Sequence, residues 1–294
     1  MSTRPAVSII GVGNMGGAMA ANLLERGWTV QVCDVDASKV ADLERKGALA
    51  LATPAQAAIN SVAFLVCVVD AVQTEAVLFG PAGLACMLQP GHTVLLCPTI
   101  APQEIESFAA RLASLGVHTV DAPMSGGPAR ARDGSMSLMV ACAQPVFEAQ
   151  AELLQALSNK LFRISERPGD GARTKLVNNL LAGINLVGAA EVLVLAERLG
   201  LDAGRTLDVI EQSSGQSWIG SDRLRRAIAG DYAPRAHVTL LEKDTRLALE
   251  AGKAAGFDGP LGARASQVFA DAHQAGLAAL DDAAIFKYLG GRQI

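Results

Sequence analysis

Short runs of β-branched and apolar residues alternate with Ala- and Leu-rich stretches of helical length through the first half of this 294-residue chain. Strand runs that are apolar throughout are typical of a sheet covered on both faces. Their alternation with helices predicts a parallel sheet with right-handed crossovers. The expected strands are residues 7–10, 29–33, 62–68, 93–97, 117–120 and 137–141, and the clearest helical stretches between them are residues 16–26, 38–46 and 102–115.

The pattern changes after about residue 165. A Pro-Gly-Asp-Gly turn at residues 168–171 is followed by helical spacing only, beginning with residues 172–199, which are apolar nearly all round and end at Gly200. Such a helix is normally buried between domains or subunits, so we expect a homo-oligomer, either a dimer or a tetramer. Further helices are expected at residues 202–212, 221–229, 240–255 and 261–275.

Composition excludes several classes of protein. The chain has 25 Lys and Arg against 29 Asp and Glu, a net charge of −4 that argues against binding nucleic acid or acidic membranes through bulk charge. The longest apolar run, residues 180–196, is interrupted by Asn185 and Glu191 and falls short of a clean membrane span.

Cysteine and histidine usage argues against a metal site and against disulfides. The five cysteines contain no Cys-x-x-Cys pair, and the four histidines are scattered, so neither a metal site nor a disulfide framework is expected. The N-terminal stretch reaches Gly11 after a handful of apolar residues, too few for a secretory signal core. We therefore expect a cytoplasmic protein with no metal.

The sequence GVGNMG at residues 11–16 follows the first expected strand and opens the first expected helix. In that context Gly11 permits a tight turn, Gly13 lets a pyrophosphate approach the backbone, and Gly16 allows close packing of helix on strand. Asp34 follows the second strand, where a carboxylate can bind a ribose 2′-hydroxyl and would repel a 2′-phosphate. The fold class is thus α/β: an N-terminal Rossmann-like doubly wound sheet over residues 1–167, followed by an all-α C-terminal domain over residues 168–294.

Two more motifs carry polar groups suited to a substrate. The sequence DAPMSGG, residues 121–127, ends the fifth expected strand; there Ser125 offers a hydroxyl, and Gly126 and Gly127 expose backbone N–H groups to a carboxylate. Lys175 and Asn179 stand four residues apart near the start of the long helix and so share one face. Partial burial beside a helix N-terminus disfavours the ammonium form of Lys175, which suits proton transfer near neutral pH.

Together these three motifs resemble the β-hydroxyacid dehydrogenase family over essentially the whole chain. The family includes 3-hydroxyisobutyrate dehydrogenase, 2-hydroxy-3-oxopropionate reductase and L-threonate dehydrogenase, and several stretches, such as residues 230–235, are most similar to the L-threonate branch. The resemblance implies Lys175 as the catalytic residue, with Ser125, Gly126, Gly127 and Asn179 on the substrate. It also implies a set of cofactor-binding residues: Gly11, Gly13, Asn14, Met15, Gly16, Asp34, Val69, Thr99 and Lys243.

The chain departs from the family pattern in two places. Met124 stands where valine or isoleucine is usual, and Thr245-Arg246 replaces the common Leu-Gly after Lys243-Asp244. Trp218 has no motif around it and is expected to fill core.

The expected function is hydride transfer between NAD and a small β-hydroxy acid of the 3-hydroxyisobutyrate, L-threonate or glycerate type. One alternative is an NADPH-dependent reductase of a short aldehyde acid, such as glyoxylate or succinic semialdehyde. The other is a catalytically silent dinucleotide-binding module. Asp34 favours NAD over NADP, and the presence of Lys175 favours an enzyme over a silent module.

Overall fold

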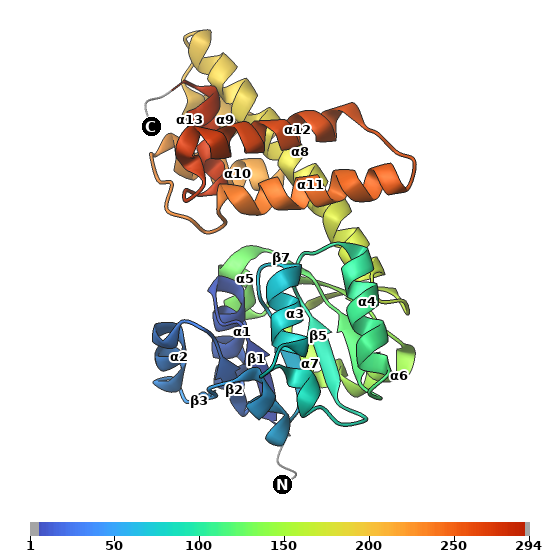
Figure 1. Cartoon of the computed structure of the whole chain (residues 1–294). Helices are drawn as coiled ribbons and strands as arrows, with labels where there is room; N and C mark the ends of the chain where they lie inside the picture. The colour runs from blue at the N-terminus through green and yellow to red at the C-terminus, as the bar shows by residue number, and fades with distance from the viewer. Residues whose placement is uncertain (1–5, 292–294) are drawn as a thin grey trace. The chain divides into compact units, whose positions relative to one another are not determined.

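The computed structural model describes residues 6–291, so the first five residues of the N-terminal stretch considered above lie outside it. Packing divides the chain into two compact units, Met1–Lys175 and Leu176–Ile294 (Figure 1). The division falls inside a continuous helix, α8 (Asp170–Arg198), whereas the sequence placed a boundary at the turn before that helix.

The first unit is built on a nine-stranded sheet with the order β3-β2-β1-β4-β5-β6-β8-β7 and with β9 paired to β8. The strands from β3 to β6 run parallel, as expected, but β8 is antiparallel to β6 and β7. All six expected strands are present, whereas the short β3 and β7 and the edge strand β9 were not predicted. The strands are β1 (Ala6–Ile10), β2 (Val30–Cys33), β3 (Leu49–Ala50), β4 (Ser61–Val66), β5 (Thr93–Leu96), β6 (His118–Asp121), β7 (Met124–Ser125), β8 (Ser137–Ala141) and β9 (Lys160–Ser165).

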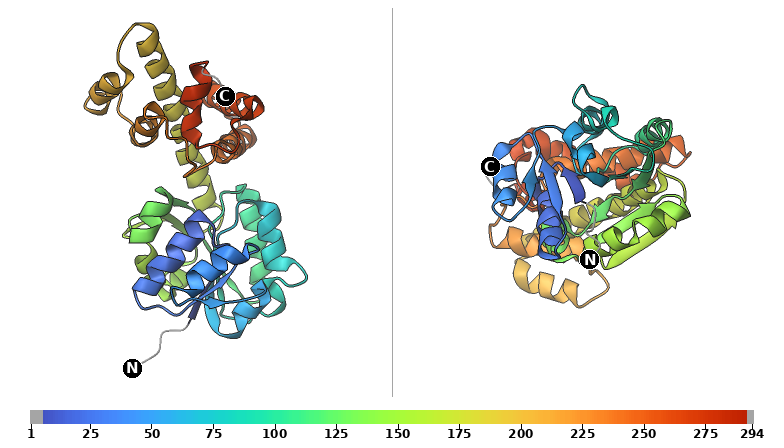
Figure 2. Two further views of the ribbon diagram at one scale, coloured as in Figure 1. Left: turned by 90° about the vertical axis from the view of Figure 1, so that its left-hand side faces the viewer. Right: turned by 90° about the horizontal axis from the view of Figure 1, so that it is seen from below.

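Helices cover both faces of this sheet, as Figure 2 also shows. Successive side chains of a strand point to opposite faces. In β4, Ala63 and Leu65 join the core cluster on one face, while Phe64 and Val66 join the cluster on the other. The first face is packed by α1 (Asn14–Glu25), α2 (Ala37–Glu44), α5 (Gly127–Asp133), α6 (Gln144–Ala149) and α7 (Ala151–Leu157), and the second by α3 (Ala71–Phe79) and α4 (Pro102–Ala113).

The register of the parallel strands aligns their carboxyl ends. Cys33, Ile10, Val66, Leu96 and Asp121 are neighbours in a row across five adjacent strands. The loops that follow these residues therefore leave the sheet at one edge, which is where open parallel sheets bind ligands.

The second unit is helical. Its core is formed around one face of α8, which contributes Leu186, Ala190 and Leu193, and it includes Phe269 and Phe286 from later helices. By length and composition α8 could cross a membrane, and 39% of its most apolar 18-residue window is buried inside the protein. The other helices are α9 (Ala203–Glu211), α10 (Trp218–Ile228), α11 (Val238–Ala254), α12 (Pro260–Ala272) and α13 (Ile285–Leu289).

Candidate active site

The glycine-rich turn joins β1 to α1 as the sequence predicts. Gly11 has φ +89°, a conformation that side chains rarely adopt, and its N–H donates to the Cys33 carbonyl at 2.9 Å. A Cβ atom on Gly16 would lie 1.9 Å from the Gly11 carbonyl oxygen. Gly11 and Gly16 are therefore required by the protein's own packing, which holds α1 against the strand.

Gly13 is different, because a Cβ atom there would meet nothing within 4 Å. It is the N-cap residue of α1 and makes no side-chain capping bond, and Asn14 and Met15 form the first turn after it. The first N–H groups of a helix have no partners within the helix and attract anions. Open space around Gly13 beside such groups is what the approach of a pyrophosphate needs.

Asp34 lies against this turn, directly after β2. Its Oδ2 accepts a 2.6 Å hydrogen bond from the Val12 N–H, and its Oδ1 accepts one of 2.9 Å from the Asp36 N–H. Val69 follows β4 and is half-exposed, and Thr99 follows β5 and is half-buried. The structure thus brings Asp34, Val69 and Thr99 to the same edge of the sheet as the glycine turn.

The predicted substrate motif occupies the same edge. Ser125 ends β7, and Gly126 and Gly127 follow at the start of α5 with φ values of +125° and +74°. A Cβ atom on Gly126 would lie 2.8 Å from the Arg130 side chain, whereas one on Gly127 would meet nothing within 4 Å. All three residues are half-buried. Both glycines, which directly follow Ser125, therefore hold backbone conformations that other residues rarely adopt.

Asp121 connects this motif to the start of α8. Its side chain is fully buried, and its Oδ2 accepts hydrogen bonds from the N–H groups of Gly169 at 2.8 Å and Ala172 at 3.0 Å. Gly171 allows the carboxylate this close, because a Cβ atom there would lie 2.9 Å from the Asp121 carboxyl carbon. Oδ1 is buried with no hydrogen-bond partner among the described residues. The hydrogen bonds to Oδ2 lower the pKa of Asp121, but burial raises it by more, to about 6.

Lys175 and Asn179 lie on one face of α8, one turn apart, and both are buried, with 7% and 9% of their surfaces exposed. Asn179 donates from Nδ2 to Asp244 Oδ2 at 2.6 Å and accepts at Oδ1 from Asn178 Nδ2 at 2.9 Å. The amide is therefore held in one orientation.

Lys243 lies on α11 in the second unit, where its Nζ is 2.9 Å from Asp244 Oδ1. That distance suits an ion pair, although the same oxygen accepts no well-directed hydrogen bond. Asp244 is buried, so its charge is balanced by Lys243 and by the Asn179 amide. The predicted contact of Lys243 with a cofactor stays a prediction.

Sequence reasoning did not assign roles to Asp121 and Asp244. Asp121 is an acidic residue among apolar neighbours, which is the signal that could have found it, since a buried carboxylate needs partners. Asp244 stands between Lys243 and Thr245 and carries no such signal. The expectation for Trp218 was wrong: it is 45% exposed, because it is the first residue of α10, directly after the N-cap residue Ser217.

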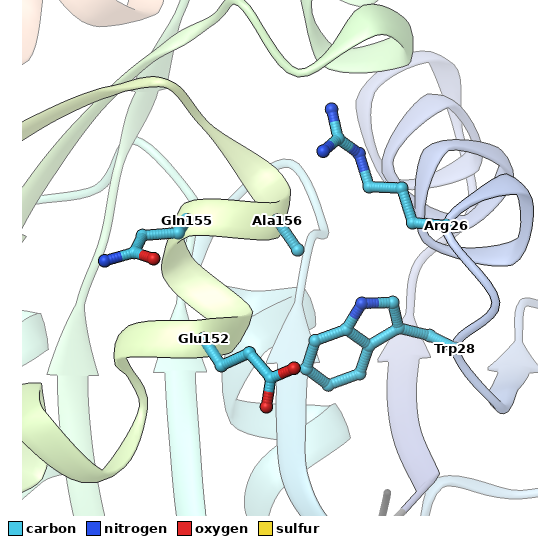
Figure 3. A pocket seen from close by; sticks show the side chains of 5 residues that line it. All are labelled: Arg26, Trp28, Glu152, Gln155 and Ala156. Atoms are coloured by element: carbon cyan, nitrogen blue, oxygen red, sulfur yellow. The ribbon is translucent and has the colours of Figure 1, made fainter.

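A shallow pocket of about 250 Å³ lies elsewhere on the first unit and is not this site (Figure 3). Arg26 is the C-cap residue of α1 and Trp28 precedes β2, so the pocket is at the amino end of the strands, opposite the edge where parallel sheets bind ligands. Its remaining lining comes from α7.

Among the described residues, no group of three His, Cys, Asp or Glu side chains could hold a metal ion.

Both units of the chain match known protein families. Residues 6–165 match the family described as the NAD binding domain of 6-phosphogluconate dehydrogenase, and residues 169–289 match the family described as NAD-binding of NADP-dependent 3-hydroxyisobutyrate dehydrogenase. The L-threonate dehydrogenase of Cupriavidus necator is 36% identical over 288 residues, which cover 98% of this chain and 97% of that protein.

Solved structures give the same picture. A 3-hydroxyisobutyrate dehydrogenase from Salmonella typhimurium has a TM-score of 0.91 at 34% identity, covering 97% of this chain and 100% of that one. The protein Psf3, solved in complex with NADP+ and 2-OPP, has a TM-score of 0.90 at 28% identity, covering 96% of this chain and 99% of that one. The likeness therefore extends through the sheet and the helices alike.

The glycine turn predicts a contrast between two alanine variants. Gly16→Ala should lower the free energy of unfolding by at least about 2 kcal/mol, because its Cβ meets backbone. Gly13→Ala should change it by less than about 1 kcal/mol yet weaken dinucleotide binding at least about tenfold. Urea unfolding and fluorescence titration with the dinucleotide measure the two effects; a Gly13→Ala protein that binds normally would contradict this role.

Asp121 predicts a pH-dependent difference in stability. Its native pKa of about 6 exceeds the usual value of 3.8, so the native state holds this proton more tightly than the unfolded state. Stability contributed by this group therefore falls as the pH rises from about 4 to 6, by roughly 3 kcal/mol, and is constant above. Asp121→Asn should abolish that loss in urea unfolding, while Asp258→Asn, a change at an exposed loop residue, should leave it as in wild type. Parallel pH profiles for wild type and Asp121→Asn would refute the assignment.

Proposed function

Because the chain belongs to the β-hydroxyacid dehydrogenase family, we propose that it oxidises a small β-hydroxy acid of the L-threonate, 3-hydroxyisobutyrate or glycerate type with NAD, in the cytoplasm. It is a hydroxyacid dehydrogenase that uses a nicotinamide dinucleotide. The observation that carries the proposal is the buried Lys175 on a helix whose first turn is anchored by Asp121, the first residue of the motif that ends in Ser125, Gly126 and Gly127.

The dinucleotide would be held at the carboxyl edge of the sheet, and when bound it supplies the hydride acceptor. Gly13 and the first turn of α1 would receive its pyrophosphate, and Asp34 would receive the adenosine ribose. Val69 and Thr99 follow β4 and β5 and would contact the same dinucleotide. Lys243 would act on the cofactor through the ammonium that Asp244 orients.

The substrate carboxylate would accept hydrogen bonds from the Ser125 hydroxyl and the N–H groups of Gly126 and Gly127. Lys175 Nζ would take the proton of the hydroxyl group as the C–H bond breaks. Asn179 would orient the substrate hydroxyl or Lys175, because Asp244 and Asn178 fix its amide and leave one further N–H to donate.

Asp34 supports NAD as the cofactor. Its carboxylate is tied to the glycine turn by the Val12 N–H, so a 2′-phosphate brought to that turn would meet a negative charge held in place. The same carboxylate would accept hydrogen bonds from the 2′-hydroxyl of NAD, and charge-assisted bonds of this kind contribute about 1.5–3 kcal/mol.

The proposal predicts activity with L-threonate, glycerate or 3-hydroxyisobutyrate, and at least about tenfold higher kcat/KM with NAD than with NADP. The assay follows the absorbance of the reduced nicotinamide for each acid and each cofactor. Asp34→Asn keeps an oxygen that can accept the hydrogen bond from the Val12 N–H but removes the negative charge. It should therefore lower the ratio of kcat/KM with NAD to kcat/KM with NADP. Higher kcat/KM with NADP in wild type would show that Asp34 does not select the cofactor and would favour the NADPH-dependent reductase.

Lys175→Ala should lower kcat about 10²–10⁴-fold with dinucleotide affinity intact, since general acid–base catalysis contributes a factor of that size. Lys175→Arg should restore little, because a guanidinium does not readily give up a proton. Lys160→Ala removes an exposed lysine with the same change of charge and is the matched control. A Lys175→Ala enzyme that keeps more than a tenth of the wild-type kcat would remove Lys175 from the mechanism and favour the silent module.

A further inference from the structure

Two cysteines lie side by side at the carboxyl edge of the sheet in the first unit. Cys67 directly follows β4, and Cys97 directly follows β5. These strands are parallel neighbours, and their last residues, Val66 and Leu96, are paired in register. The Cys97 N–H donates to the Val66 carbonyl at 3.0 Å, which extends the ladder by one residue. Cys67 and Cys97 are therefore the next neighbours along the two strands.

The two thiols also point to the same face of the sheet. Leu65 and Leu95, two residues before each cysteine, belong to the core cluster packed by α1, and side chains two apart on a strand share a face. Cys97 belongs to that cluster, and Cys67 packs against it. Neighbouring strands are about 4.8 Å apart, which is within the range of about 4.4–6.8 Å between the Cα atoms of a disulfide.

The other three cysteines are not placed for such a bond. All five lie within residues 6–291. Cys33 belongs to the core cluster on the opposite face of the sheet. Cys142 follows β8, which is two strands away from β5. Cys86 is exposed and lies in a short helical turn before β5. Within the described residues, a disulfide inside the chain can therefore join only Cys67 and Cys97.

The pair adjoins the glycine turn and two of the proposed cofactor contacts. A Cβ atom on Gly16 would lie 3.2 Å from the Cβ of Cys67, so the Cys67 side chain packs where α1 meets the sheet. Val69 and Thr99 each stand two residues after one of the two cysteines. An S–S bond is about 2 Å long, shorter than any contact between two thiols, so forming it would draw the beginnings of both loops together.

We propose that Cys67 and Cys97 are an oxidation site, at which a peroxide converts the two thiols into a reversible disulfide that weakens dinucleotide binding. The effect on binding rests on the proposed function, through Val69 and Thr99. A hydrogen bond with Cys97, together with burial, raises the pKa of the Cys67 thiol well above its usual range. Because the thiolate is the reactive form, the pair stays reduced until exposure to peroxide is sustained.

The reaction is a two-electron oxidation. Cys67, the less buried of the two, loses its proton and attacks a peroxide oxygen; the O–O bond breaks, leaving a sulfenic acid on Cys67, and the released hydroxide takes up the proton as water. Cys97 then loses its proton and attacks the Cys67 sulfur, so that the S–S bond forms, the S–O bond breaks and a second water leaves. Two thiols are oxidised and one hydrogen peroxide is reduced to two waters, and a small thiol reverses the change by exchange.

Thiol titration after denaturation tests the disulfide directly. The Cys86→Ala protein is used, because exposed Cys86 would react on its own. Sustained treatment with hydrogen peroxide should lower its thiols from four to two, and dithiothreitol should restore them. After alkylation of the free thiols, cleavage at Glu75 separates Cys67 from Cys97, so mass spectrometry with and without reductant identifies the linked pair.

Fluorescence titration with NADH tests the effect on binding in the same Cys86→Ala protein. The oxidised form should bind NADH at least about tenfold more weakly than the reduced form, and dithiothreitol should restore the affinity. A further Cys97→Ala change should remove this effect of peroxide, because the disulfide cannot form. Cys33→Ala is the matched control, since it removes a buried thiol on the other face and should leave the loss of affinity unchanged.

The two measurements separate this proposal from the proposed function. Four thiols after oxidation, a link between other cysteines, or equal affinity of the reduced and oxidised forms would each overturn it. A reduced protein that does not bind NADH would contradict the proposed function and, with it, the effect on binding. The thiol count decides whether the disulfide forms in either case.

Discussion

The candidate site depends on one buried carboxylate at the N-terminus of α8. Asp121 ends a strand of the parallel sheet, and helix α8 begins 49 residues later in the chain. Asp121 Oδ2 accepts from the N–H of Gly169, just before this helix, and from that of Ala172 in its first turn. Burial of a charge is costly, and these two bonds and the positive end of the helix offset the cost only in part, which is why the pKa of Asp121 is raised. Lys175, which is 7% exposed, stands five residues after the first residue of the same helix.

Elements whose pattern is local could be predicted from the sequence. Strands such as β1 and β4 are apolar runs long enough to identify, and the glycine turn after β1 is constrained by Gly11 and Gly16 alone. The two-residue strands β3 and β7 leave no periodic signal, and the direction of β8 depends on pairing rather than on its own residues. The order and direction of the strands around β8 therefore depend on tertiary contacts, which no short stretch of sequence specifies.

The same distinction holds within the site. The shared face of Lys175 and Asn179 follows from helical spacing, so the sequence could predict it. The partners that hold these side chains could not be predicted, because Asp244 is 65 residues from Asn179 in the chain and meets it only when α11 packs on α8. Spacing therefore identifies the groups that could perform chemistry, while the fold determines which buried carboxylates orient them.

Helix α8 shows why composition alone leaves the role of a long apolar helix open. Its residues 172–199 are apolar nearly all round, a pattern shared by core helices, membrane spans and subunit contacts. Packing separates these roles by face: Leu186, Ala190 and Leu193 enter the core of the second unit, whereas Val177, Leu181, Leu195 and Leu199 remain exposed. Composition therefore identifies the helix, whereas only the packing of the second unit shows which of its residues belong to the core.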